Sequence, residues 1–184
     1  CKSDFVAWDK FGTEHGARAW VKSIYNGDTT GSHFPYLKKA FLNSKGPVLE
    51  MGTGAGSTVQ LHLLCAEHKR DLYSLDNDPK WIERYEELQS DNHVFMCMKD
   101  PAQTKLLDGT IKFGVIFIDH APGESRRHAI LRAKTISQYI VVHDTEELGY
   151  NVESVLSSFK YRRDFKRSRP WTTVVSDFQE IWRD

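Results

Sequence analysis

A glycine-rich stretch is the first part of this 184-residue chain that could bind a ligand. Residues 48–58 read V-L-E-M-G-T-G-A-G-S-T, an apolar run that enters glycines and then a helical pattern. Glycines let a ligand approach the backbone closely, and the start of the next helix attracts anionic groups. The spacing is neither the dinucleotide pattern G-x-G-x-x-G nor a P-loop. We therefore predict a ligand-binding strand-to-helix turn, with an unliganded tight turn as the alternative.

A carboxylate, Asp76, closes the next apolar run at residues 72–75. A carboxylate at the end of this strand can accept hydrogen bonds from both hydroxyls of a ribose. The alternative role is a helix cap, but Asp78 is better placed for it because it directly precedes Pro79. The sequence therefore favours ribose binding for Asp76 and capping for Asp78.

Two further apolar runs end in acid and histidine pairs, Asp119-His120 and His143-Asp144. Carboxylates that converge at one edge of a sheet suit Mg²⁺ or Mn²⁺. Each histidine is a candidate base for removing a proton from a substrate, and a purely structural histidine is the alternative. The sequence that follows Asp119 includes Arg126, which either contacts substrate or belongs to a charged first turn of a helix.

Short apolar runs and helical spacings alternate along the chain, which predicts a parallel sheet with helices on both faces. The carboxyl ends of such strands form the ligand-binding edge. Two apolar stripes predict core-facing helices, one from Trp81 to Leu88 and one from Leu148 to Phe159. The predicted strands are residues 47–51, 72–75, 94–98, 113–118, 140–142 and 172–175, and the basic segment 160–169 has the period of a half-exposed strand.

The pattern E-x-G-x-G-x-G after a first strand resembles the first motif of the class I S-adenosylmethionine-dependent methyltransferases. The resemblance implies a Rossmann-like fold, a seven-stranded mostly parallel sheet whose last two strands form an antiparallel hairpin. It implies that S-adenosylmethionine is the cofactor and that Glu50 helps hold its amino group. Asp100 resembles the position that meets the adenine ring, with a helix cap before Pro101 as the alternative. The cofactor-binding residues expected are Glu50, Gly52, Thr53, Gly54, Gly56, Ser57, Asp76, Asn77, Asp100 and Asp119.

Asp119 and Asp144 also resemble the metal-binding aspartates of catechol O-methyltransferase and its relatives. This resemblance implies a divalent cation, Mg²⁺ or Mn²⁺. From their place at the strand ends, His120 and His143 are the candidate bases, with Asp119 or Asp144 instead if no metal is bound. Thr145 stands where that family has an asparagine, so Thr145, Glu146 or water is the expected further ligand. The family's lysine is also absent, since Pro122 takes its place.

His-Asp-Thr-Glu at residues 143–146 and the stretch 170–176 resemble sugar O-methyltransferases, including those that cap rhamnose. A hydroxyl of a sugar or glycan is therefore the expected acceptor.

Composition sets the remaining expectations. With 40% hydrophobic residues, the chain is expected to be one globular domain. Its expected parts are a helical cover at 1–45 and a core at 46–184, and excision from a longer protein stays open. Three cysteines and no bilayer-length apolar run favour a cytoplasmic protein without a membrane span. Twenty-five basic residues against 25 acidic residues give no net charge, which disfavours nucleic acid as a partner.

Two other functions stay open. The basic segment 160–169 suits an RNA or nucleotide methyltransferase, and a non-catalytic Rossmann-like module would need no chemistry. The sequence leaves the oligomeric state undecided.

Overall fold

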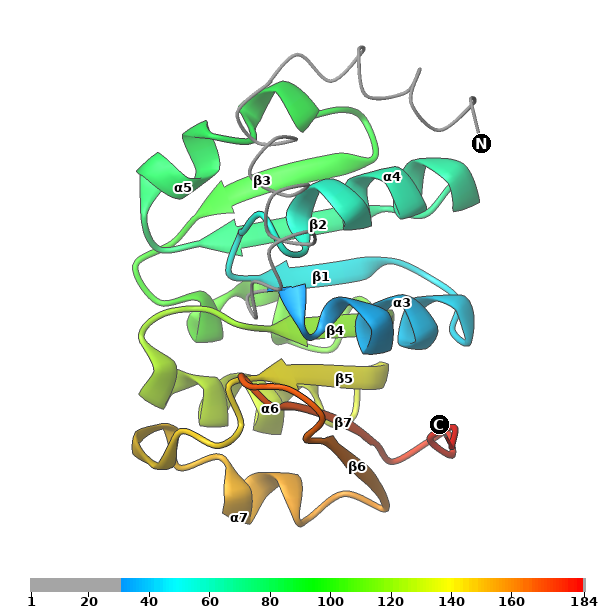
Figure 1. Cartoon of the computed structure of the whole chain (residues 1–184). Helices are drawn as coiled ribbons and strands as arrows, with labels where there is room; N and C mark the ends of the chain where they lie inside the picture. The colour runs from blue at the N-terminus through cyan, green and yellow to red at the C-terminus, as the bar shows by residue number, and fades with distance from the viewer. Residues whose placement is uncertain (1–30, 184) are drawn as a thin grey trace.

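The computed structural model describes residues 31–183, and its centre is a seven-stranded sheet in the order β3-β2-β1-β4-β5-β7-β6 (Figure 1). Five strands are parallel, while β7 is antiparallel to both β5 and β6. The predicted Rossmann-like methyltransferase fold is therefore confirmed, including the terminal hairpin. The strands are β1 Val48–Met51, β2 Leu72–Asp76, β3 His93–Cys97, β4 Phe113–Ile118, β5 Ser137–His143, β6 Tyr161–Phe165 and β7 Thr172–Ser176.

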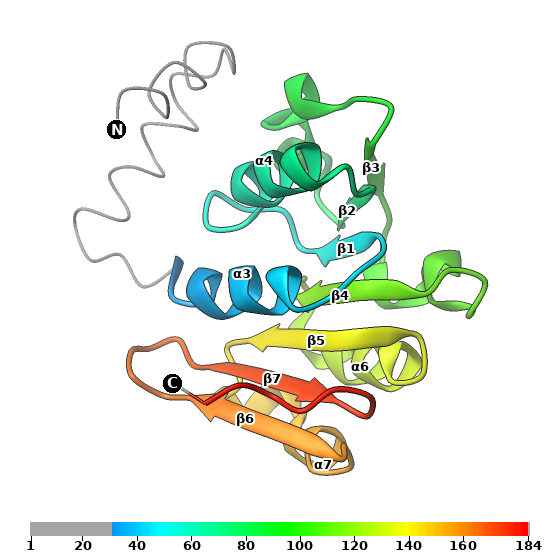
Figure 2. The same ribbon diagram turned by 90° about the vertical axis from the view of Figure 1, so that its right-hand side faces the viewer.

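Helices cover both faces of this sheet (Figure 2). On one face, α3 (Phe34–Leu42) and α4 (Thr58–His68) pack against alternate side chains of the central strands. On the other, α6 (Arg126–Ala133) and α7 (Glu153–Leu156) pack against the remaining side chains. Because β4 is covered on both faces, all six of its residues are buried, which explains its uninterrupted apolar sequence.

The stripe from Trp81 to Leu88 does not form one core-facing helix. The structure has a short α5 (Pro79–Glu83) with no buried residue, followed by the 3₁₀ turn η2 (Glu86–Leu88). Trp81 is 37% exposed, and Arg84 lies over its ring with the guanidinium carbon 4.0 Å from the ring centroid. The prediction was wrong for the first turn because an aromatic side chain can also be covered by a surface arginine.

The second predicted core-facing helix, from Leu148 to Phe159, is present only in its later part. Val155 and Leu156 are buried in α7, whereas Leu148 is 94% exposed on the 3₁₀ turn η6 (Leu148–Tyr150). The helix begins only after Asn151, which has a left-handed backbone with φ of 51°. Leu148 was therefore wrongly included in the stripe.

Of the predicted N-terminal cover, the helix expected at residues 36–42 is present as α3. The one expected at residues 18–25 lies outside the described residues. Four 3₁₀ turns complete the described elements: η3 (Pro101–Gln103), η4 (Lys105–Leu107), η5 (Gly123–Ser125) and η6. Within residues 31–183, no helix has the length and apolar character needed to cross a bilayer.

Candidate active site

The glycine turn after β1 packs directly on the backbone that follows β4. Gly52 has a φ of 99°, and a Cβ atom there would lie 2.6 Å from the carbonyl carbon and oxygen of Asp119. Only glycine fits this position, for both conformation and space. Gly54 is different, because a Cβ atom there would have no atom within 4 Å. The turn is thus closed toward Asp119 and open at Gly54, where a ligand can approach the backbone.

Glu50 lies fully buried beneath this turn. Its Oε1 accepts hydrogen bonds from the hydroxyls of Ser57 at 2.6 Å and Thr58 at 3.0 Å, and its Oε2 accepts one from Ser74 at 2.6 Å. Thr58 in turn accepts the N–H of Gly54 at 2.8 Å. Burial raises the pKa of Glu50 to about 7 despite the three hydroxyl donors. Glu50 therefore shapes the turn from below, and its predicted contact with the cofactor stays a prediction.

Asp76 ties the glycine turn to the end of β2. Its Oδ2 accepts the backbone N–H of Thr53 at 2.8 Å and the Thr53 hydroxyl at 3.0 Å, while its Oδ1 accepts the N–H of Asp78 at 2.9 Å. As predicted, Asp78 caps α5, since its side chain accepts the N–H of Lys80 at 2.9 Å. Asn77 beside it is exposed at the same edge. Asp76 is therefore held in place by the turn that it would help to complete as a ribose site.

Asp100 performs the capping role that the sequence left open. Its carboxylate accepts the N–H of Ala102 at 3.1 Å and begins η3, with Pro101 as the first residue of that turn. Asp100 follows β3, where the resemblance implies an adenine contact. That contact stays a prediction.

Asp119 and His143 form a pair at the ends of neighbouring strands β4 and β5. His143 Nδ1 lies 3.2 Å from Asp119 Oδ2 and 3.3 Å from Asp144 Oδ1. Burial lowers the pKa of His143, but the hydrogen bond and charge of Asp119, with the charge of Asp144, outweigh it and leave the pKa raised. The other ring nitrogen, Nε2, lies 3.2 Å from the hydroxyl of Ser32. This is the arrangement of a histidine base that a carboxylate orients.

Arg126 joins the two strand-end aspartates. Its Nη2 lies 3.1 Å from Asp119 Oδ1, and its Nη1 lies 3.2 Å from Asp144 Oδ2. Asp144 has a φ of 55°, a left-handed conformation that aspartate tolerates better than most residues. The structure therefore brings together Asp119, Asp144 and His143, as predicted from the strand ends, with an arginine between the carboxylates.

The other two predicted metal ligands point elsewhere. The Thr145 hydroxyl lies 3.0 Å from the hydroxyl of Thr173 on β7, and Glu146 Oε2 accepts the N–H of Trp171 at 2.7 Å. Thr145 and Glu146 are thus engaged by β7 and the loop before it, and the predicted cation at Asp119 and Asp144 stays a prediction. A different group does cluster: His33, Asp119 and His143 offer ligand atoms within 4.8 Å of one another.

His33 was missed by the sequence reasoning. It is 2% exposed, and neither ring nitrogen has a hydrogen-bond partner within residues 31–183. Its ring centroid lies 4.5 Å from that of His143 and 4.6 Å from that of Phe117. Burial and the neighbouring His143 lower the pKa of His33 to about 3, so its imidazole is neutral. The residue just before α3 carries no local motif, so only the tertiary contact reveals it.

His120, the other predicted base, is also buried. Burial and the charge of Arg126 lower its pKa to about 4, and its Nε2 has no hydrogen-bond partner in the described part of the chain. His120 is therefore a neutral imidazole with a free nitrogen, whereas His143 is the stronger base.

Comparisons with known proteins point to the fold. No family model matches the chain, and no curated protein matches it. It is similar to a protein assigned as a caffeoyl-CoA O-methyltransferase from Staphylococcus aureus, with a TM-score of 0.63 and 10% identity over 95% of this chain and 98% of that one. The likeness is one of fold.

Two other solved structures extend the comparison. An rRNA methylase from Streptococcus thermophilus has a TM-score of 0.55 and 12% identity, covering 80% of this chain and 95% of that chain. TrmK from M. capricolum, in complex with the cofactor product S-adenosyl-homocysteine, has a TM-score of 0.52 and 8% identity, covering 76% of this chain and 66% of that chain. Methyltransferases of small molecules and of RNA thus share this architecture.

Proposed function

We propose that the protein transfers the methyl group of S-adenosylmethionine to a hydroxyl group, with a sugar as the acceptor. The observation that carries this proposal is the direct contact between the open glycine turn and the Asp119–His143 pair, made where Gly52 packs on Asp119. A methyl donor held over the turn would lie beside a base. The fold, shared with solved methyltransferases, supports the same reading.

The residues in and around the glycine turn would each play a different part in binding the cofactor. Gly54 leaves space for it, Asp76 would offer its carboxylate to the ribose hydroxyls, and Glu50 keeps the turn in shape from beneath. Bound there, S-adenosylmethionine would supply a methyl group activated by its sulfonium. Methyl transfer then depends on positioning the acceptor oxygen in line with that methyl group.

His143 would take the proton. As the acceptor oxygen bonds to the methyl carbon, the carbon–sulfur bond breaks and the hydroxyl proton passes to His143 Nε2. In the structure this nitrogen lies 3.2 Å from the hydroxyl oxygen of Ser32, so the acceptor hydroxyl would take the place of that side chain. Asp119 and Asp144 stabilise the protonated imidazole through its other nitrogen.

Support for a sugar as the acceptor class comes from the loop that carries Trp171. The loop between β6 and β7 reaches the site of His143, because Ser32 donates a hydrogen bond to the carbonyl of Pro170 at 2.8 Å. The next residue, Trp171, is half-buried, and its backbone N–H is held by Glu146. Lys166 Nζ lies 4.6 Å from the centroid of its indole ring. A tryptophan ring suits the apolar face of a sugar, and a lysine beside it suits the sugar hydroxyls.

The direct test is transfer of a labelled methyl group to a panel of rhamnose-type and other sugar acceptors. We expect incorporation with the wild-type protein and loss of it with His143→Gln. His128→Gln is the matched control, because that histidine is exposed on α6. Incorporation that persists in His143→Gln would contradict the proposed base.

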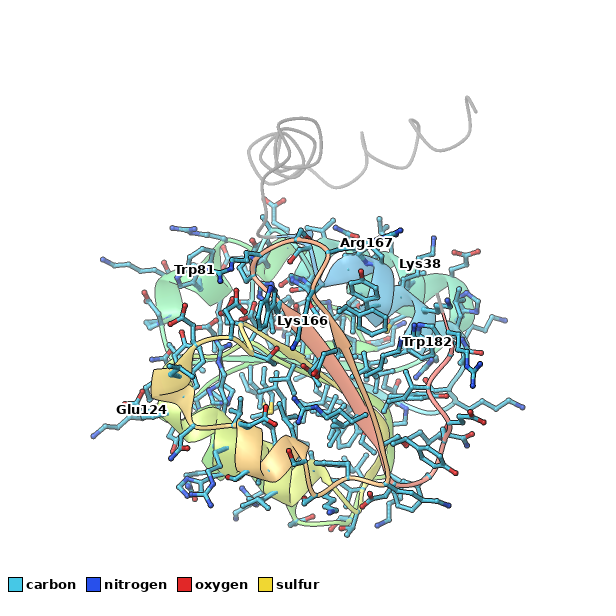
Figure 3. All side chains as sticks on the ribbon, turned by 60° about the horizontal axis from the view of Figure 1, so that its bottom comes forward. Lys38, Trp81, Glu124, Lys166, Arg167 and Trp182 are labelled. Carbon is cyan, nitrogen blue, oxygen red and sulfur yellow. The ribbon has the colours of Figure 1, made fainter. Side chains whose placement is uncertain are left out.

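RNA methylation is a second candidate, favoured by the exposed basic residues of the β6–β7 loop, among them Lys166 and Arg167 (Figure 3). The arginines of β6 itself are engaged: Arg162 pairs with Glu153 and Asp164, and Arg163 donates to the carbonyl of Trp182. Binding of RNA that weakens steeply with salt, and that Arg167→Glu reduces, would favour RNA over a sugar.

A further inference from the structure

The guanidinium of Arg126 lies in surroundings that would suit a metal cation. Besides the two carboxylates of Asp119 and Asp144, it meets two backbone carbonyl oxygens: Nε donates to His120 O at 2.8 Å, and Nη1 to His143 O at 3.1 Å. Carboxylate and carbonyl oxygens are also the ligands of hard divalent cations. An arginine therefore occupies the place between the strand ends where the sequence predicts a metal.

The local structure is built to hold this arginine. Arg126 is the first residue of α6, and its side chain is 6% exposed. Tyr150 lies against it, with the guanidinium carbon 4.7 Å from the ring centroid. The ring of Tyr150 also fills the space where Gly123 would carry a Cβ atom, so this glycine leaves room for the tyrosine. The arrangement involves β4, β5, η5, η6 and α6 and is not a chance surface pair.

We propose that Arg126 takes the place of a divalent cation in this protein and is a positioning residue for methyl transfer that needs no metal. The catalytic part of this statement rests on the proposed function, whereas the part about cation binding does not. Arg126 fixes Asp119 and Asp144, and these carboxylates orient His143. A guanidinium has five N–H donors, and four of them face the two carboxylates and the two carbonyl oxygens.

The balance of charge supports this assignment. Asp119 and Asp144 bring two negative charges, and Arg126 brings one positive charge. Protonation of His143 during the reaction adds the second positive charge and makes the cluster neutral. A divalent cation beside the guanidinium would instead place like charges a few ångströms apart in a buried site, which is unfavourable.

Titration with Mn²⁺ followed by electron paramagnetic resonance tests the proposal on the purified chain without any acceptor. We expect the wild-type protein to bind no stoichiometric Mn²⁺. In Arg126→Ala, the two carboxylates lose their cation, and we expect a new site at least about tenfold tighter than any wild-type binding. Arg162→Ala is the matched control, because it also removes an arginine from between two carboxylates, Glu153 of α7 and Asp164 of the partly exposed strand β6. We expect no such site in that variant.

The same titration with Co²⁺, followed by visible absorption, tests the cluster of His33, Asp119 and His143. One equivalent of either ion bound by the wild-type protein, and lost in Asp119→Asn, would overturn the proposal. Failure of folded Arg126→Ala to bind Mn²⁺ would also overturn it. If that variant does not fold, the wild-type titrations still decide between the two outcomes.

Measurements of methyl-transfer activity provide a second test of the proposal. Arg126→Lys keeps the charge but cannot reproduce the two-sided contact with both aspartates. We expect methyl transfer by the wild type to be unchanged by a chelator, and transfer by Arg126→Lys to fall at least about tenfold with unchanged cofactor affinity. Loss of wild-type activity with the chelator would contradict the proposal. Absence of cofactor binding would defeat the proposed function and leave the titration result intact.

Discussion

Two acids near the carboxyl edge of the sheet, the fully buried Glu50 and the partly buried Asp119, have their charge balanced in opposite ways. Glu50 receives only hydroxyl donors, and burial raises its pKa to about 7. Burial acts on Asp119 in the same sense, but His143 and Arg126 outweigh it and keep its pKa lowered. A carboxylate beneath a binding turn can be held by neutral groups, whereas one that orients a base must stay charged. The comparison separates the region proposed to shape a cofactor site from the region proposed to carry the chemistry.

The largest expected effect follows from removing the charge of Asp119. Asp119→Asn should lower methyl transfer by about 10²- to 10⁴-fold, because His143 loses the carboxylate that orients it. Cofactor affinity should stay within about threefold, since Gly52 packs on the backbone of residue 119 and not on its side chain. Turnover and calorimetric titration measure the two quantities. Loss of both together would assign Asp119 to the fold or the cofactor.

The ionisation of Glu50 should make the free energy of unfolding depend on pH. Its pKa is raised from 4.5 to about 7 on folding, so the folded state binds the proton more tightly than the unfolded state. The free energy of unfolding should therefore fall as pH rises from 4.5 to 7, by on the order of 3 kcal/mol from this group. Glu50→Gln should remove that part of the slope. Denaturant unfolding at several pH values measures it, and an unchanged slope in the variant would contradict the raised pKa.

A smaller effect is expected at Asp76. Asp76→Asn should weaken binding of S-adenosylmethionine by about 10- to 100-fold, because the amide loses the charged acceptor for ribose hydroxyls. Asp78→Asn is the matched control, since it changes the acid that caps α5 two residues away. Equal loss of affinity in both variants would show that Asp76 acts only through the local turn.

The smallest expected effect concerns the fall of kcat/KM at low pH, the acid limb of the pH–rate profile. Activity should fall as pH drops below the pKa of His143, which lies above its ordinary value of 6.5, because the base must be unprotonated. Asp144→Asn removes one of the charges that raise this pKa, so the limb should move to lower pH. The pH dependence of kcat/KM for both proteins measures the shift. A limb that moves to higher pH would contradict the assignment.

Much of this arrangement follows from the sequence because strand ends mark it. Buried runs such as 113–118 predict β4 closely, and parallel strands bring Asp119 and Asp144 to one edge. The capping role of Asp78 follows equally from Pro79 beside it. Local pattern and tertiary structure agree at these positions.

The residues that complete the site could not be predicted in the same way. His33 meets His143 only through the packing of α3, and no local spacing relates the two. The sequence is equally consistent with Arg126 as an ordinary charged residue in the first turn of a helix. Its contacts with Asp119 and Asp144 depend on the fold. Thr145 follows Asp144 directly, yet its hydroxyl meets Thr173 on β7. Contacts across distant segments decide these roles.

The proposed methyl transfer depends most directly on whether the glycine turn binds S-adenosylmethionine beside His143. Calorimetric titration of S-adenosylmethionine into the wild-type protein, with and without Mg²⁺ or Mn²⁺, tests this. We predict binding of one equivalent, with the same affinity whether or not the cation is present. Absence of binding under every condition would contradict the account and leave a Rossmann-like module without this chemistry.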